Sequence, residues 1–128
     1  MRLELLVALG GAIGSVARYK FGGWVLHQTA AWKFPLGTFL INVLGCLVIG
    51  VLAGLAVKED YFSPEARVFL FTGICGGYTT FSAFGLETFN LLRRDEFMVA
   101  GSYVALSLVL GLFALWIGFS LIPHNFHK

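Results

Sequence analysis

Apolar residues dominate four long windows of this chain, and short polar segments separate the windows. They run roughly over 3–26, 36–57, 64–92 and 97–122. A helix needs about 20 mostly apolar residues to cross the hydrocarbon core of a bilayer, and each window reaches that length. The pattern therefore predicts an all-α membrane protein with four transmembrane helices, folded as a single domain over residues 1–128.

Residues that start helices support these boundaries. Pro35 stands just before the second window, and Pro64 follows Ser63 at the start of the third. Serine is a favoured helix N-cap, and proline suits the first helical turn because its missing N–H would be unpaired there in any case. Small residues also recur one helical turn apart, which favours close helix packing in lipid. These pairs are Gly10 and Gly14, Gly50 and Gly54, and Gly73 and Gly77.

The third window contains a segment that does not suit a lipid-facing helix. From Gly73 to Glu87 it reads GICGGYTTFSAFGLE, with a glycine pair followed by two threonines. Irregular backbone survives at membrane depth only where protein or a water-filled cavity satisfies its N–H and C=O groups. Broken helices of this kind often hold ions in transport proteins. We expect the Gly76-Gly77 pair to break the third helix, and this segment to be the functional centre.

Composition narrows the class of protein further. Charged residues make up 12% of the chain, hydrophobic residues 58%, and the mean hydropathy is +0.82. Soluble domains carry about 25% charged residues, so lipid is the expected solvent and little chain is left for an extramembrane domain. Cys46 and Cys75 lie in apolar windows, which predicts buried thiols. No zinc spacing and no nucleophile–base pair is present, so an enzyme is not expected, and a net charge of +2 gives no reason to expect nucleic acid.

The basic residues are almost balanced between the two sides of a four-span topology. One side carries four and the other five, where a clear excess would fix the orientation. The even count predicts dual topology and an antiparallel homodimer, since closed two-fold dimers are the commonest oligomers; a weak bias resolved by some other feature is the alternative. The two groups are Arg2, Lys58, Arg67 and Lys128, and Arg18, Lys20, Lys33, Arg93 and Arg94.

Two polar residues stand within the first two windows. Arg18 lies near the far end of the first window, where it either snorkels to the interface or places a positive charge at the mouth of an anion path. Asn42 is surrounded by apolar neighbours in the second window. Its amide either bonds a neighbouring helix or donates to a passing anion.

Aromatic and hydroxyl groups add a candidate pathway. Phe81 and Phe84 share a helix face directly after the expected break, and the positive edges of their rings would attract a small anion. The alternative places both rings in the core or against lipid. Further polar candidates that could line a pore are Ser82, Glu87, Tyr103 and Ser107.

Three motifs together resemble the Fluc (CrcB) fluoride channels. They are Gly10-Gly11-x-x-Gly14-x-x-x-Arg18, Pro35-x-Gly37-Thr38-x-x-x-Asn42, and Gly73-x-x-Gly76-Gly77-x-Thr79-Thr80-Phe81-Ser82-x-Phe84. The resemblance implies a fluoride-selective channel in the cell (inner) membrane, exporting fluoride passively from the cytoplasm. It also implies an antiparallel homodimer with two pores and a central structural sodium ion.

The resemblance also assigns roles to single residues. Asn42 would be the pore asparagine, and Phe81 and Phe84 the paired pore phenylalanines. The carbonyl groups of Gly76 and Thr79 would hold the sodium ion, for which backbone oxygens at a break are suitable ligands. Ser82, Glu87, Tyr103 and Ser107 would line the fluoride pathway, and Arg18 matches a characteristic arginine of the first helix.

One position departs from the family pattern, and two other functions compete. Ala83 stands where many relatives have threonine, which puts a continuous hydroxyl track in doubt. A small multidrug-type transporter would also have four short helices, but it needs a carboxylate deep in the membrane; Glu4 and Glu87 lie near the ends of their windows. A helical assembly subunit without transport would need neither a helix break nor a pore amide.

Overall fold

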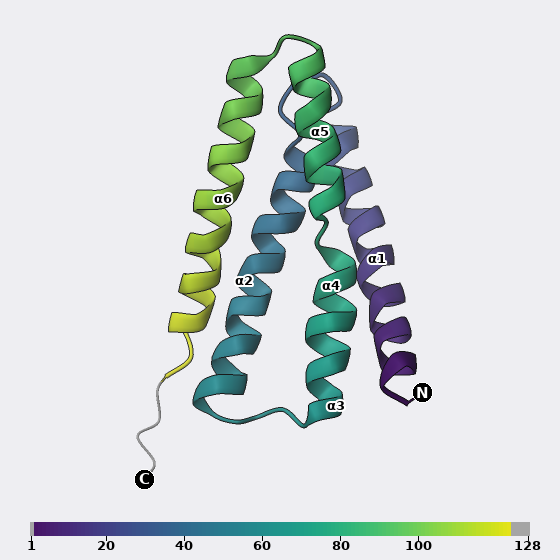
Figure 1. Ribbon diagram of the computed structural model, residues 1–128, viewed down its shortest axis with the longest axis vertical. Helices are drawn as coiled ribbons and strands as arrows, with labels where there is room; N and C mark the ends of the chain where they lie inside the picture. The colour runs from purple at the N-terminus through teal and green to yellow at the C-terminus, as the bar shows by residue number, and fades with distance from the viewer. Residues whose placement is uncertain (1, 124–128) are drawn as a thin grey trace.

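The computed structural model describes residues 2–123, and this part of the chain is helical with short connections and contains no strand (Figure 1). The predicted all-α class is confirmed for these residues. Lys128, counted above among the basic residues, lies outside them. The elements are α1 (Arg2–Gln28), α2 (Leu36–Lys58), α3 (Pro64–Arg67), the π-helix η1 (Val68–Cys75), α4 (Gly76–Tyr78), α5 (Phe81–Arg93) and α6 (Phe97–Ser120).

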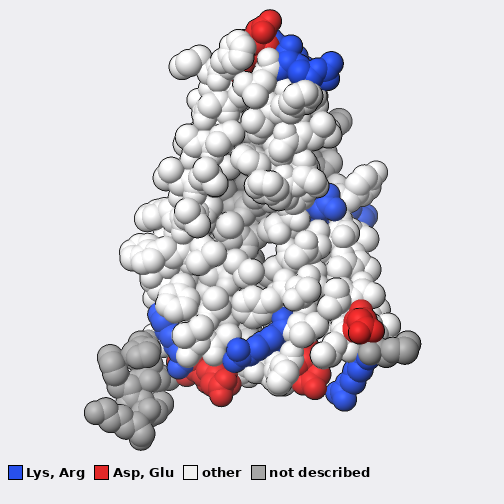
Figure 2. Space-filling model, viewed as in Figure 1, with Lys and Arg blue, Asp and Glu red and all other residues white. Residues whose placement is uncertain are grey.

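Three helical stretches are long and apolar enough to cross a membrane. They are α2, the stretch Pro64–Arg93 that runs from α3 through α5, and α6. Charged atoms gather at the two ends of the molecule and leave most of its middle uncharged (Figure 2). At 27 residues α1 is long enough as well, but Arg18 and Lys20 make it more polar than the other three. The chain is thus a multi-pass membrane protein, and the fourth span remains a prediction.

The third membrane stretch is interrupted, but not at the glycine pair. Gly76 and Gly77 belong to α4, and the expectation that they break the helix is wrong. The backbone becomes extended at Thr79 and Thr80, with ψ angles of 158° and 112°, before α5 begins at Phe81. Gly77 serves packing instead, because a Cβ atom there would lie 2.6 Å from the carbonyl oxygen of Gly11 on α1.

The start of this stretch follows its sequence signal, and its middle does not. Ser63 accepts a hydrogen bond of 3.2 Å from the Ala66 N–H, with Pro64 in the first turn, as predicted. Residues 68–75 then form the π-helix η1, which no residue pattern indicated. Such wide turns occur frequently next to functional sites in helices.

The two main helix contacts depend on glycine. Helix α1 packs along η1 and α4, and α2 packs along α6. A Cβ atom at Gly10 would lie 2.6 Å from the Phe69 carbonyl oxygen, and one at Gly14 would overlap the Ile74 carbonyl oxygen. In the other pair, a Cβ atom at Gly50 would overlap the carbonyl oxygen of Leu115. The predicted close approach of helices at small residues is therefore confirmed.

These contacts leave a small core and a large apolar surface. Tyr103 on α6 is fully buried, and the buried cluster around it contains Leu91 and Ala100. Phe81, the first residue of α5, is by contrast 83% exposed. Lipid accounts for exposed apolar side chains in a membrane protein, but Phe81 lies next to the polar backbone of the interruption.

Alanine at a close helix contact should therefore destabilise the protein. Gly14→Ala would push α1 away from η1, which we expect to cost about 1–3 kcal/mol and to lower the thermal midpoint in detergent by several degrees. Gly101→Ala on α6 is the matched control, because its Cβ atom would meet nothing within 4 Å. Equal midpoints for the two variants would contradict the glycine-dependent packing.

Candidate functional site

The interruption of the third stretch is held by the side chain of Asn42 on α2. Its Nδ2 donates to the carbonyl oxygen of Thr80 at 3.1 Å, and its Oδ1 accepts from the Thr80 N–H at 2.9 Å. One amide side chain thus pairs both polar groups of an extended residue. Backbone that leaves the helix at membrane depth requires partners of this kind.

Arg18 on α1 contacts the same interruption from the other side. Its Nε donates to the carbonyl oxygen of Gly77 at 3.2 Å, and the residue is half-buried. The sequence left open whether Arg18 reaches the membrane interface or an ion path. In the structure at least one of its guanidinium donors is directed to the interruption. Because a guanidinium stays protonated in proteins, Arg18 also places a positive charge at this depth.

Two other carbonyl groups lose their helical partners. In a continuous α-helix the Thr80 N–H would bond the Gly76 carbonyl, and the Ala83 N–H would bond that of Thr79. The first donates to Asn42, and the second donates to the Thr80 hydroxyl at 3.2 Å. The interruption therefore redirects the N–H donors that would serve the carbonyl groups of Gly76 and Thr79, the two groups to which the motif resemblance assigns the sodium ion.

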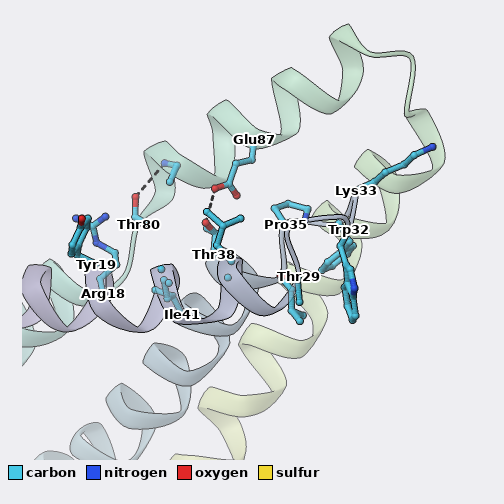
Figure 3. A pocket seen from close by; sticks show the side chains of 17 residues that line it. Arg18, Tyr19, Thr29, Trp32, Lys33, Pro35, Thr38, Ile41, Thr80 and Glu87 are labelled. Carbon is cyan, nitrogen blue, oxygen red and sulfur yellow. Dashed lines mark hydrogen bonds between the residues drawn. The ribbon is translucent and has the colours of Figure 1, made fainter.

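A carboxylate further along α5 links three helices through hydrogen bonds. Glu87 accepts from the hydroxyl of Thr38 on α2 at 2.6 Å and from the hydroxyl of Tyr103 on α6 at 2.9 Å. One oxygen serves each donor, so both carboxylate oxygens are engaged. Figure 3 shows Glu87 directed toward Thr38 across the space between α5 and α2.

Two cavities flank the interruption. The outer cavity has a volume of about 500 Å³ and is lined by Arg18, Thr38 and Glu87 together with the connection between α1 and α2 (Figure 3). A second cavity of about 380 Å³, called the break cavity here, is lined by a different set of residues. Thr80 lines both cavities. Other residues that line the break cavity include Asn42, Gly76, Thr79, Phe81, Phe84 and Ser107.

One buried polar atom in the break cavity lacks a partner. The Oγ of Ser107 is inaccessible to solvent, and among the residues 2–123 it is the one such side-chain oxygen or nitrogen without a hydrogen bond. Buried hydroxyl groups are nearly always bonded to protein or water. Ser107 is one of the residues that line this cavity, and its hydroxyl has an unused donor and an unused acceptor.

Two aromatic rings also line the break cavity. The ring centroids of Phe81 and Phe84 are 5.8 Å apart, with the ring planes inclined at 44°, and Phe84 packs on Tyr103 at 5.1 Å. Ser82 differs from the other candidates, because it is exposed and lines neither cavity. Its hydroxyl lies 3.3 Å from that of Thr80.

The structure thus divides the predicted site residues between two places. The break cavity gathers Asn42, Phe81, Phe84 and Ser107, with Gly76 and Thr79, while Arg18 and Glu87 line the outer cavity and Tyr103 reaches it through Glu87. Sequence reasoning missed Thr38 and Thr80 as contributors. Thr38 precedes Asn42 by four residues on one helix, and this spacing could have found it.

Side-chain chemistry for a metal ion is not evident here. Within residues 2–123, no three histidine, cysteine, aspartate or glutamate side chains come together as possible ligands. A cation bound in this region would need backbone oxygens. The carbonyl groups of Gly76 and Thr79 meet that requirement in kind, because their helical donors bond elsewhere.

Membrane-length helices, a polar interruption halfway along one of them and two cavities that meet the interruption at Thr80 define a multi-pass membrane protein of the transport class. Residues 5–119 match the family described as CrcB-like protein, Camphor Resistance (CrcB). The chain belongs to this CrcB family, and the resemblance inferred from its motifs is confirmed.

Relatives of this chain carry a more specific name. A protein of Methylobacillus flagellatus named Fluoride-specific ion channel FluC is 58% identical over 118 residues, covering 92% of each chain. Proteins of the same name are 51% identical in Hyphomonas neptunium, covering 89% of this chain and 90% of the relative, and 44% identical in Flavobacterium psychrophilum, covering 92% and 94%.

Removing the Asn42 amide should loosen the interruption. In Asn42→Ala the Thr80 N–H and C=O lose their partners, which we expect to cost about 1–3 kcal/mol for each group left unpaired. The thermal midpoint in detergent should fall accordingly. Asn90→Ala on α5 is the control, because that amide makes an exposed bond of 3.4 Å to Arg93. If both variants unfold at the wild-type temperature, Asn42 does not hold the interruption.

Proposed function

We propose that this chain forms a fluoride-selective channel through which fluoride leaves the cytoplasm passively. Family membership and relatives named as fluoride channels at up to 58% identity support the proposal. They place the protein among ion channels and not among enzymes, as the sequence predicted. The membrane-length helices fit a cell (inner) membrane location.

The observation that carries the proposal is the convergence of an amide, a hydroxyl and two aromatic rings on the break cavity. Ser107 contributes an unpartnered hydroxyl. The Asn42 amide group has two N–H bonds and uses one for the Thr80 carbonyl, so a second donor remains. Phe81 and Phe84 add aromatic rings, whose edges carry positive potential. A small, strongly hydrated anion needs such groups to replace its water.

The two cavities suggest the direction of the path. Thr80 lines both, so an ion entering the outer cavity past Arg18 would reach the break cavity beside this residue. Arg18 raises the local concentration of anions, since positive charge in a cleft attracts them. The engaged Glu87 carboxylate lies on the same route, where its two hydroxyl donors partly compensate its charge.

A second copy would complete the site. Phe81 is 83% exposed and Ser82 is exposed, although both stand beside the polar interruption of a membrane helix. A partner that covers this face would shield the break cavity from lipid. With the near balance of basic residues between the two ends, we propose an antiparallel homodimer of dual topology with one pore per chain.

The proposed dimer gives a role to the carbonyl groups of Gly76 and Thr79, whose helical donors bond elsewhere. A two-fold axis beside the interruption would bring two Gly76 and two Thr79 carbonyl oxygens together as four ligands. Sodium fits such a set of neutral oxygens, whereas zinc prefers nitrogen and sulfur, and magnesium demands an octahedron and retains waters. We therefore propose a structural sodium ion at the centre of the dimer.

Fluoride efflux from liposomes that contain only this protein tests the function. The wild type should release fluoride and retain chloride. Phe81→Ile and Phe84→Ile keep apolar bulk but remove the ring edges, so each should lower the fluoride flux at least tenfold. Phe113→Ile is the control, because that ring lies half-exposed on α6 and stacks on Trp116 away from both cavities. No fluoride release by the wild type would refute the channel.

Sodium removal tests the assembly. If the ion ties two copies together, prolonged replacement of sodium by a large organic cation should lower fluoride flux and raise the monomer fraction. Flux should not depend on the direction of a sodium gradient, because the ion is not transported. The flux and the cross-linked dimer fraction are measured on the same preparation, and an unchanged value of both after full exchange would contradict the sodium site.

A further inference from the structure

Lys33 lies at the wall of the outer cavity. It belongs to the connection between α1 and α2, which is well anchored. The Thr29 hydroxyl bonds the Val25 carbonyl oxygen at 2.8 Å, and the Phe34 ring packs edge-on against Tyr103 at 5.4 Å. Lys33 is thus attached to a fixed support at the rim of the cavity.

The ammonium group of Lys33 has one acidic partner. Its Nζ lies 2.8 Å from an oxygen of Glu96, at the N-terminus of α6, and the two side chains are 67% and 29% exposed. Figure 3 shows Lys33 extending from the connection away from Glu87, so its charge lies at the outer rim. An exposed pair of this kind contributes little to stability because water screens it. Its effect on nearby ions remains.

From this placement we infer that Lys33 attracts fluoride to the mouth of the outer cavity and that Glu96 attenuates this attraction. The inference rests on the proposed channel function. The deeper positive group, Arg18, is already bonded to the Gly77 carbonyl oxygen. Glu87 on the inner wall has both oxygens engaged by hydroxyl groups. Lys33 is therefore the exposed cation of the cavity lining, and Glu96 sets how much of its charge an approaching anion meets.

The expected effect is small and depends on salt. One unit charge about 10 Å from an anion in water changes the local anion concentration about twofold. The screening length is about 30 Å at 0.01 M ionic strength and about 3 Å at 1 M, so the effect should be present in dilute buffer and absent in concentrated salt. The fluoride concentration must be low enough that entry limits the flux.

The experiment compares two neutral variants of the full chain in liposomes. At about 0.01 M ionic strength, Lys33→Gln should lower fluoride flux about twofold, whereas Glu96→Gln should raise it by a similar factor. Both differences should vanish at about 1 M of an impermeant salt. Lys33→Arg, which keeps the charge, should retain wild-type flux. Lys20→Gln is the matched control, because that lysine is exposed on α1 and does not line the cavity.

Flux changes of opposite sign in the two neutral variants distinguish anion attraction from a purely structural role of the ion pair. If the ion pair only ties the α1–α2 connection to the α5–α6 connection, both neutral variants should lower the flux alike at every salt concentration. The double exchange of Lys33→Glu with Glu96→Lys should then restore the wild-type flux. That result would overturn the inference, as would unchanged flux in Lys33→Gln at low salt while the wild type conducts. A wild type without fluoride flux would instead refute the channel itself.

Discussion

The paired hydrogen bonds between Asn42 and Thr80 are the interaction on which the rest of the structure depends. A helix that becomes extended inside a membrane exposes an N–H and a C=O group for which lipid offers no partner. Supplying both partners from one side chain requires α2 to lie directly beside the interruption. Gly45 on α2 permits this approach, because a Cβ atom there would overlap the Thr79 side chain.

The same groups that satisfy the interruption also line the cavities, and this limits how tightly an ion can bind. Asn42 keeps one N–H for an ion, the Thr80 hydroxyl is already an acceptor for Ala83, and both oxygens of Glu87 have donors. An anion would therefore meet partly engaged groups rather than a complete cage. Conduction requires sites that are favourable enough to enter and weak enough to leave. Partial engagement of the polar groups is one way to meet both conditions.

The sequence predicted the helices, their starts and the small-residue contacts, because these follow from length, apolar content and local capping rules. It also placed Asn42, Phe81, Phe84 and Ser107 among the candidates, which the structure brings to one cavity. The interruption itself was misplaced by about three residues. Glycine permits extended backbone, but it also permits close packing, and here Gly77 is used for contact with α1. The π-helix and the pair of Lys33 with Glu96 depend on tertiary contacts, which no local pattern encodes.

The polarity of an interrupted helix would suit both of the ions proposed for this place. The helical stretch before Thr79 ends with carbonyl groups directed along the chain, and this negative end favours a cation. After Thr80, α5 begins with N–H groups at its positive end, where anions are favoured. Ser107 and the phenylalanine rings line the cavity next to this second end, and Gly76 lies on the first. A continuous helix would present neither end at membrane depth, so the interruption itself supplies the opposite partial charges that the proposed sodium and fluoride sites require.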